Sequence, residues 1–198
     1  MSFFPLWNQQ GVLPPCPDDP LRAAGPPRSP YKVTLPEVVQ RFATSPKRIE
    51  ILDGLLRYRA ALHEAGLTRG FQWLNGSFLE NKEAMLGQDP GDIDVATFLH
   101  LPSAVDQAQI VADDPLTFGP DGDARKKHYH VDAYLNGLEV SPTRPIEMVV
   151  ARSHYWYGVF SHSRRNFIWK GFLEVDLASG EDAASANLLD TFARGVTP

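Results

Sequence analysis

The chain has 198 residues, of which 43% are hydrophobic and 22% are charged, and these proportions are ordinary for one soluble globular domain. The formal net charge of −5 argues against a dedicated binder of duplex DNA, because such a protein usually carries a basic surface. The single cysteine, Cys16, excludes an intrachain disulfide and suits a reducing cytoplasm. We expect no signal peptide, because the first residues lack its basic residues and apolar core, and no transmembrane helix, because no apolar run approaches ~20 residues.

The first 30 residues are rich in proline. They hold eight of the 17 prolines of the chain, which forbid a helix and favour extended or turn backbone. The same segment carries bulky apolar side chains that are unfavourable in water, namely Phe3, Phe4, Leu6 and Trp7. We therefore expect residues 1–30 to form an arm that packs across the domain of residues 31–198 or against a partner.

Two helix starts follow the arm. Thr34 and Glu37 have the spacing of a capping box, which predicts that a helix begins after Thr34. Ser45 followed by Pro46 predicts a second helix start, because serine caps the free N–H groups and proline suits the first helical position. Gly66 predicts the end of this second helix.

The rest of the chain alternates between predicted strands and predicted helices. In chain order the pattern predicts a strand over 71–75, a short helix over 78–87, a strand over 92–99, a helix over 102–112, a strand over 127–135, a helix over 144–160, a strand over 168–177 and a helix over 185–193. Strands separated by helices predict an α/β (α+β) fold, a single domain with a small mixed sheet flanked by helices.

The most informative motifs stand at the ends of two predicted strands. Gly76 and Ser77 follow the strand over 71–75, and a turn of small residues with free backbone N–H groups lets a phosphate approach. Asp92 and Asp94 open the next strand and share one face, because successive side chains alternate. Two adjacent carboxylates repel each other, and a hard divalent cation such as Mg²⁺ would relieve that repulsion.

A third carboxylate has two possible sources. Asp132 lies on the predicted strand over 127–135, whereas Glu174 and Asp176 lie at strand spacing later in the chain. Both sources would supply the oxygen ligands that a divalent cation prefers.

Two histidines alternate with Asp132. On a strand, His128 and His130 would point the same way as Asp132, and the run resembles the His-x-His-x-Asp-His motif of metallo-β-lactamase-type hydrolases without its final histidine. The alternatives are that both histidines flank Asp132 and contact a nucleotide, or that they are ordinary, partly exposed strand residues.

The order Gly-Ser, Asp-x-Asp and a later single Asp resembles the DNA polymerase β-type nucleotidyltransferase superfamily, and more closely its minimal bacterial members. The resemblance implies that Gly76 and Ser77 contact a nucleoside triphosphate. It also implies that Asp92, Asp94 and Asp132 are the catalytic carboxylates and hold Mg²⁺ or Mn²⁺. The wording of residues 70–78 and 169–173 is also similar to a small bacterial family of unassigned function.

A basic and aromatic patch follows in the last third of the chain. Its members are Arg152, His154, Tyr155, Trp156, Tyr157, His162, Arg164, Arg165, Trp169 and Lys170. Arginine matches phosphate geometry and aromatic rings stack on bases, so Arg164, Arg165 and Lys170 would hold the triphosphate or a nucleic-acid acceptor. The alternative is that the cations form a solvated rim around four core aromatic residues, Trp156, Phe160, Phe167 and Trp169.

These observations support two hypotheses. The first is a cytoplasmic, Mg²⁺-dependent nucleotidyltransferase that moves a nucleoside monophosphate from a triphosphate to a hydroxyl of a protein or RNA, with a homodimer or an operon partner as further possibilities. The resemblance implies a toxin–antitoxin or defence setting for it. The second is a catalytically inactive nucleotide-binding or protein-interaction module of the same fold. Glu80 and Glu83 favour the second, because they bring negative charge to the place of a triphosphate.

Overall fold

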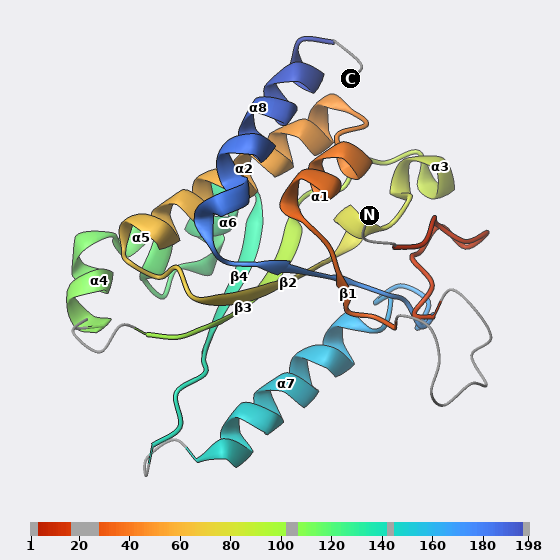
Figure 1. Ribbon diagram of the computed structural model, residues 1–198. Coiled ribbons are helices and arrows are strands. Elements are labelled where there is room, and N and C mark those ends of the chain that lie inside the picture. The colour runs from red at the N-terminus through yellow and green to blue at the C-terminus, as the bar shows by residue number, and fades with distance from the viewer. Residues whose placement is uncertain (1–3, 17–27, 102–106, 142–144, 196–198) are drawn as a thin grey trace.

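The computed structural model describes residues 4–16, 28–101, 107–141 and 145–195. Its centre is a five-stranded mixed sheet in the order β1-β5-β2-β3-β4 (Figure 1). The strands are β1 (Tyr31–Lys32), β2 (Gly70–Asn75), β3 (Ile93–Leu99), β4 (Val131–Gly137) and β5 (Leu173–Asp176). Strand β2 is antiparallel to both β3 and β5, whereas β3 and β4 are parallel, as are β1 and β5. The predicted α/β domain with a small mixed sheet is confirmed.

Helices cover both faces of the sheet. They are α1 (Leu35–Phe42), α2 (Pro46–Glu64), α3 (Lys82–Leu86), α4 (Gln107–Asp113), α5 (Pro115–Phe118), α6 (Gly122–Tyr129), α7 (Ile146–Phe160) and α8 (Asp182–Ala193). Helices α1, α2, α6 and α8 lie on one side of the sheet, and α7 lies on the other (Figure 1). None of the helices in the described ranges has both the length and the hydrophobicity that crossing a bilayer requires.

The first two helices begin where their caps predict. The Thr34 hydroxyl accepts from the backbone N–H of Glu37, and the Glu37 carboxylate accepts from the backbone N–H of Thr34, which completes the capping box. Ser45 caps α2 through its hydroxyl alone, which accepts from the Arg48 N–H, and that helix ends at Glu64, shortly before Gly66 adopts a φ of +77°. Local signals therefore suffice for these boundaries.

The described part of the arm packs on the domain. Phe4 and Trp7 both place their rings against Phe42 of α1, and the Trp7 indole N–H donates to the Leu79 carbonyl at 2.7 Å. Val12 is buried as well. These contacts bury apolar surface that would otherwise face water.

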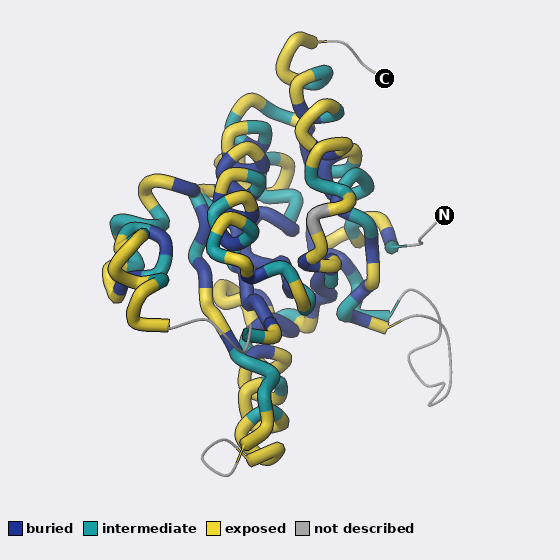
Figure 2. The backbone as a smooth tube through the Cα atoms, turned by 60° about the vertical axis from the view of Figure 1, so that its left-hand side comes forward, coloured by how far each residue is buried: buried dark blue, intermediate teal, exposed yellow. Residues whose placement is uncertain are grey.

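Helix α7 is held to the sheet mainly through its C-terminal half. Trp156 and Phe160 are its two buried residues, and the Phe160 ring packs edge-on against Phe172 at 5.7 Å between centroids. The N-terminal half projects away from the body (Figure 2), with Ile146 and Met148 about half exposed. The sheet therefore fixes the end of α7 and the chain that follows it.

The predicted strand over 127–135 is partly wrong. Residues Gly122–Tyr129 form α6, and β4 begins only at Val131. The Asp121 carboxylate caps this helix by accepting from the Ala124 N–H, and His130 ends it in the left-handed conformation with φ +55°. Because a helix and not a strand precedes Asp132, His128 and His130 do not point the same way as Asp132.

Two other predictions differ at their ends. The strand predicted over 168–177 is limited to Leu173–Asp176, because Trp169 instead forms a single bridge with His162. The helix predicted over 102–112 is observed as Gln107–Asp113, and its expected first residues lie outside the described ranges.

Arg48 of α2 is fully buried and joins the helix to the segment after Ser77. Its guanidinium donates to the Glu83 carboxylate at 2.5 and 2.8 Å, and to the carbonyls of Phe78 and Glu80 at 2.6 and 2.7 Å. Removing one partner of a buried pair leaves the other charge without compensation, which usually costs several kcal/mol.

We expect Arg48→Ala to lower the free energy of unfolding by about 3 kcal/mol, because Glu83 and two carbonyls lose their donor. Urea denaturation measures this change. The matched control is Arg194→Ala, which removes an exposed helical pair with Asp190 and should cost about 0.5 kcal/mol or less. Equal effects of the two substitutions would show that Arg48 does not fix this segment.

Candidate functional site

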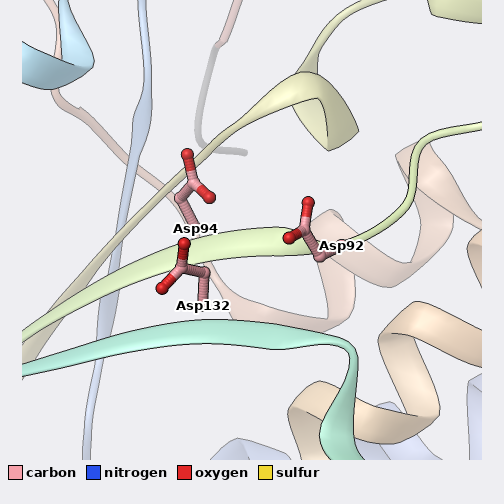
Figure 3. Close-up of side chains that lie close together, drawn as sticks. All are labelled: Asp92, Asp94 and Asp132. Atoms are coloured by element: carbon pink, nitrogen blue, oxygen red, sulfur yellow. The ribbon is translucent and has the colours of Figure 1, made fainter. Parts of the chain in front are cut away.

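Three aspartates meet at one edge of the sheet. Asp94 of β3 is the direct partner of Asp132 in the parallel strand β4, so both side chains share a face. Asp92 stands just before β3, and Figure 3 shows its carboxylate beside the other two. One carboxylate oxygen from each residue lies within 4.8 Å of the others. Three hard oxygen donors at this separation fit a divalent cation such as Mg²⁺ or Mn²⁺.

The structure decides between the two possible sources of the third carboxylate. Asp132 completes the cluster, whereas Glu174 accepts from the Trp73 indole N–H at 2.9 Å and lies 3.5 Å from the Lys32 ammonium. Asp176 is paired in register with Phe71, at the other end of β2 from the aspartates. Glu174 and Asp176 are therefore not part of the acidic site.

The electrostatics of the cluster show a strain that a cation would relieve. The pKa of Asp94 is raised to about 6, mainly by burial; the Arg164 guanidinium opposes this rise, and the neighbouring charges of Asp92 and Asp132 add to it. The Arg164 Nη2 lies 3.6 Å from an Asp94 carboxylate oxygen. Asp94 therefore carries its charge at neutral pH against the preference of its surroundings.

Lys126 is a site residue that the sequence analysis did not identify. It comes from the last turn of α6, and its ammonium contacts the Asp92 carboxylate and lies 3.5 Å from Asp132. The hydrogen bond to Asp92 raises the pKa of Lys126. Sequence analysis could have found Lys126 only by predicting α6, because this helix places Lys126 near the start of β4.

The Gly-Ser turn lies directly against the acidic cluster. Asn75, the last residue of β2, pairs with Asp94, and Gly76 follows with φ +86° and ψ −172°, a conformation that is essentially restricted to glycine. A Cβ on Gly76 would lie only 3.1 Å from the Asp94 Cγ and backbone nitrogen. Ser77 then starts a short 3₁₀ turn. The glycine is therefore required both by its conformation and by the close approach of Asp94.

A cavity of about 230 Å³ brings together the predicted residues other than Asp132, which lies beside Asp94 but does not line the cavity. Its lining includes Gly76, Ser77, Asp92, Asp94, Lys126, His162, Arg164, Arg165 and Lys170. Two groups of different charge therefore face one space, with carboxylates from β3 on one side and cations from the chain after α7 on another. A larger cavity of about 410 Å³ along β4 is lined by residues such as Tyr134 and Trp156 and by none of the three aspartates.

Lys170 differs from the two arginines, because its ammonium already has protein partners. It is 3% exposed and donates to the Glu80 carboxylate at 2.6 Å and to the Gly76 carbonyl at 3.2 Å. Arg48 pairs with Glu83 in the same way. The negative charges that sequence analysis placed beside the Gly-Ser turn are therefore both compensated within the protein.

The prediction that His128 and His130 lie on a strand and point the same way as Asp132 is wrong, although both side chains are at least partly exposed. His130 Nε2 lies 2.8 Å from Glu50 of α2, and His128 Nε2 lies 3.3 Å from the Arg57 guanidinium. Both side chains thus point to α2, because α6 rather than a strand carries the chain to Asp132. The run has no metallo-β-lactamase-type arrangement.

The aromatic residues of the patch divide into two groups. Trp156 and Phe160 are buried in the core, as the alternative interpretation expected, whereas Phe167 is 81% exposed and Trp169 is 48% exposed. The cations Arg164 and Arg165 line the cavity. Periodicity alone could not separate the two groups, because exposure depends on where the chain leaves the sheet.

Comparison with known proteins gives a family but no activity. The model of a family described as "Family of unknown function (DUF6932)" matches residues 5–176, a span that contains every residue of the acidic cluster and the Gly-Ser turn. No curated protein and no solved structure matches the chain.

We expect Gly76→Ala to lower the free energy of unfolding by more than about 2 kcal/mol, because it combines a disfavoured conformation with a contact against Asp94. Gly87→Ala is the matched control, since Gly87 has a φ of +64° but no atom within 4 Å of an added Cβ. It should cost about 1 kcal/mol. Thermal unfolding of both variants measures the difference, and equal losses would contradict the close approach.

The raised pKa of Asp94 predicts a pH-dependent difference between the wild type and Asp94→Asn. Because the folded pKa lies above the unfolded value, Asp94 favours folding when it is protonated and loses that contribution as pH rises through about 6. In buffer with a chelator, Asp94→Asn should be more stable than the wild type near pH 7, by about 1–3 kcal/mol, and similar near pH 4. Urea denaturation across this range measures the difference, and one that does not change with pH would contradict the assignment.

Proposed function

The chain belongs to the DUF6932 family, whose function is unknown, and from its own site we propose that it is a metal-dependent nucleotidyltransferase. It would move a nucleoside monophosphate from a nucleoside triphosphate to a hydroxyl group of an RNA or protein acceptor. A cytoplasmic location belongs to the same proposal, since the single cysteine suits a reducing compartment.

The observation that carries the proposal is the residue pairing of β2 with β3 and of β3 with β4 at the end of the sheet where the site lies. Asn75 pairs with Asp94, and Asp94 pairs with Asp132, so the glycine turn after Asn75 lies beside two carboxylates on the same face. A phosphate at Gly76 would therefore approach any cation that the carboxylates hold. Phosphate-binding backbone and metal-binding oxygens are the two components that nucleotidyl transfer needs.

Each group has a chemical task in this proposal. Asp92, Asp94 and Asp132 would hold Mg²⁺ or Mn²⁺, which when bound supplies Lewis-acid stabilisation of the phosphate charge. Ser77 and the backbone N–H groups of its turn would contact the triphosphate, and Arg164 would add positive charge beside it. The acceptor oxygen would bond to the α-phosphorus as the bond to the β-phosphate oxygen breaks, with pyrophosphate leaving and the hydroxyl proton passing to a carboxylate.

One observation favours the inactive module as a second candidate. The ammonium of Lys126 already contacts Asp92 and Asp132, and Arg164 lies beside Asp94, so the chain partly neutralises its own acidic cluster. A module without a metal needs such internal cations to keep the three carboxylates together. An enzyme would instead exchange them for a divalent ion.

The two candidates predict different results when ATP, GTP, CTP and UTP are titrated into the protein with and without Mg²⁺. For the enzyme we expect Mg²⁺-dependent binding of at least one triphosphate, and a loss of about 10-fold or more in affinity in Asp92→Asn/Asp94→Asn, because metal ligands are removed. Isothermal calorimetry measures both.

Asp53→Asn is the matched control, because Asp53 is an exposed aspartate on α2, paired with Arg57. It should leave the affinity unchanged. Binding of a triphosphate that is indifferent to Mg²⁺ and to the double substitution would support the inactive module. No binding of any triphosphate would overturn both the nucleotidyltransferase and the nucleotide-binding module.

A further inference from the structure

The segment between α7 and β5 forms a closed turn whose two ends are joined. His162 and Trp169 make an antiparallel bridge, the Ser163 N–H donates to the Ile168 carbonyl, and the Phe167 N–H donates to the Ser163 carbonyl, both at 2.9 Å. We call residues 162–169 the aromatic turn. Its shape is therefore set by its own backbone hydrogen bonds.

The aromatic turn presents two large rings to solvent. Phe167 is 81% exposed and has a φ of +56°, a strained backbone conformation that is rare for a bulky residue. Trp169 is 48% exposed. Both the strain and the exposure oppose folding, and neither is needed to bury apolar surface. Such features concentrate where a protein contacts a ligand.

The aromatic turn also borders the acidic site. Four of its residues, His162, Ser163, Arg164 and Arg165, line the cavity that contains Asp92 and Asp94. Arg164 reaches to 3.6 Å from Asp94, although its side chain is 74% exposed. A molecule lying on the exposed rings would therefore have one end at the carboxylates.

We propose that the aromatic turn docks a single-stranded nucleic acid and thereby delivers the acceptor hydroxyl, an inference that rests on the proposed nucleotidyl transfer. Each nucleotide offers a base with a flat π-face and a phosphate, and the turn offers the complementary pair of groups. Phe167 and Trp169 stack on bases, and Arg165 binds a backbone phosphate.

Charge favours a nucleic acid over a neutral or basic protein surface as the acceptor. The chain as a whole has a net charge of −5, yet residues 161–172 contain two arginines, a lysine and a histidine and no acidic residue. Because Lys170 is buried and paired with Glu80, the charge available to a ligand comes from Arg164 and Arg165, next to the site where chemistry is proposed. A short cationic segment with exposed rings suits a flexible strand better than a duplex, whose binding requires a more extended basic surface.

The test is fluorescence anisotropy with a labelled single-stranded RNA of about ten nucleotides and a DNA of the same sequence, measured without metal or triphosphate. We expect binding of at least one strand, and a loss of about 5- to 100-fold for Phe167→Ala and Trp169→Ala, since each substitution removes a stacking partner. Arg165→Ala should make the slope of log affinity against log salt less steep by about 0.7.

Two matched controls separate this effect from a general change of surface. Leu6→Ala truncates a side chain that is 71% exposed on the arm, and Arg194→Ala removes an arginine that is 77% exposed at the end of α8. Both should bind the strand like the wild type. Circular dichroism and thermal unfolding establish that every variant is folded.

These experiments distinguish a failure of the docking proposal from a failure of the proposed nucleotidyl transfer. No binding of either strand, or equal binding by the turn variants and the wild type, overturns the docking proposal even where the triphosphate titration succeeds. Transfer of a labelled nucleotide to a protein instead of to a nucleic-acid strand would also overturn the docking proposal. Strand binding that depends on Phe167 and Arg165, with no binding of any triphosphate, keeps the docking surface and rejects nucleotidyl transfer.

Discussion

The parallel pairing of β3 with β4 is the constraint on which the site depends. It places Asp94 beside Asp132 on one face, and the antiparallel pairing of β3 with β2 places Asn75 on the other side of Asp94. A shift of one residue in either pairing would turn an aspartate to the opposite face of the sheet. Because that opposite face packs under α2 and α6, the apolar core resists such a shift and thereby holds the carboxylates together.

Holding like charges together requires compensation, and the protein supplies it from three separate elements. Lys126 comes from α6, Arg164 from the segment after α7, and Arg48 from α2. The first two act on the aspartates, whereas Arg48 acts on Glu83 beyond the Gly-Ser turn. Lys170 does the same for Glu80. The charges around the turn are therefore balanced pair by pair, which leaves the three aspartates as the acidic centre of the cavity.

Local sequence signals predicted the sheet edge that carries the site, and they failed where tertiary contacts decide. The alternation of Asp92 to Leu99 and the caps at Thr34 and Ser45 are complete within a few residues, so their elements were predicted. Helix α6 was missed because the stretch before it is rich in glycine and aspartate, although its capping aspartate, Asp121, belongs to that stretch. Because α6 brings Lys126 to the aspartates, missing the helix also meant missing Lys126 as a site residue.

The sequence also could not predict that Phe167 and Trp169 are exposed, because other aromatic residues of the same patch are buried in the core. What separates them is the point at which the chain leaves the sheet. Helix α7 ends at Phe160, whose carbonyl accepts from the Asn75 side chain at 3.0 Å. Beyond that bond, Phe167 and Trp169 are exposed, whereas Phe172 is buried again.

The same bond links the aromatic turn to the Gly-Ser turn. Asn75 fixes the chain at Phe160, before the aromatic turn, and Lys170 fixes it again just after the turn, through the carbonyl of Gly76. Both fixed points lie within one residue of each other in β2 and its turn. The backbone that would receive a phosphate and the segment that would receive an acceptor strand are therefore held to each other at both ends of the aromatic turn.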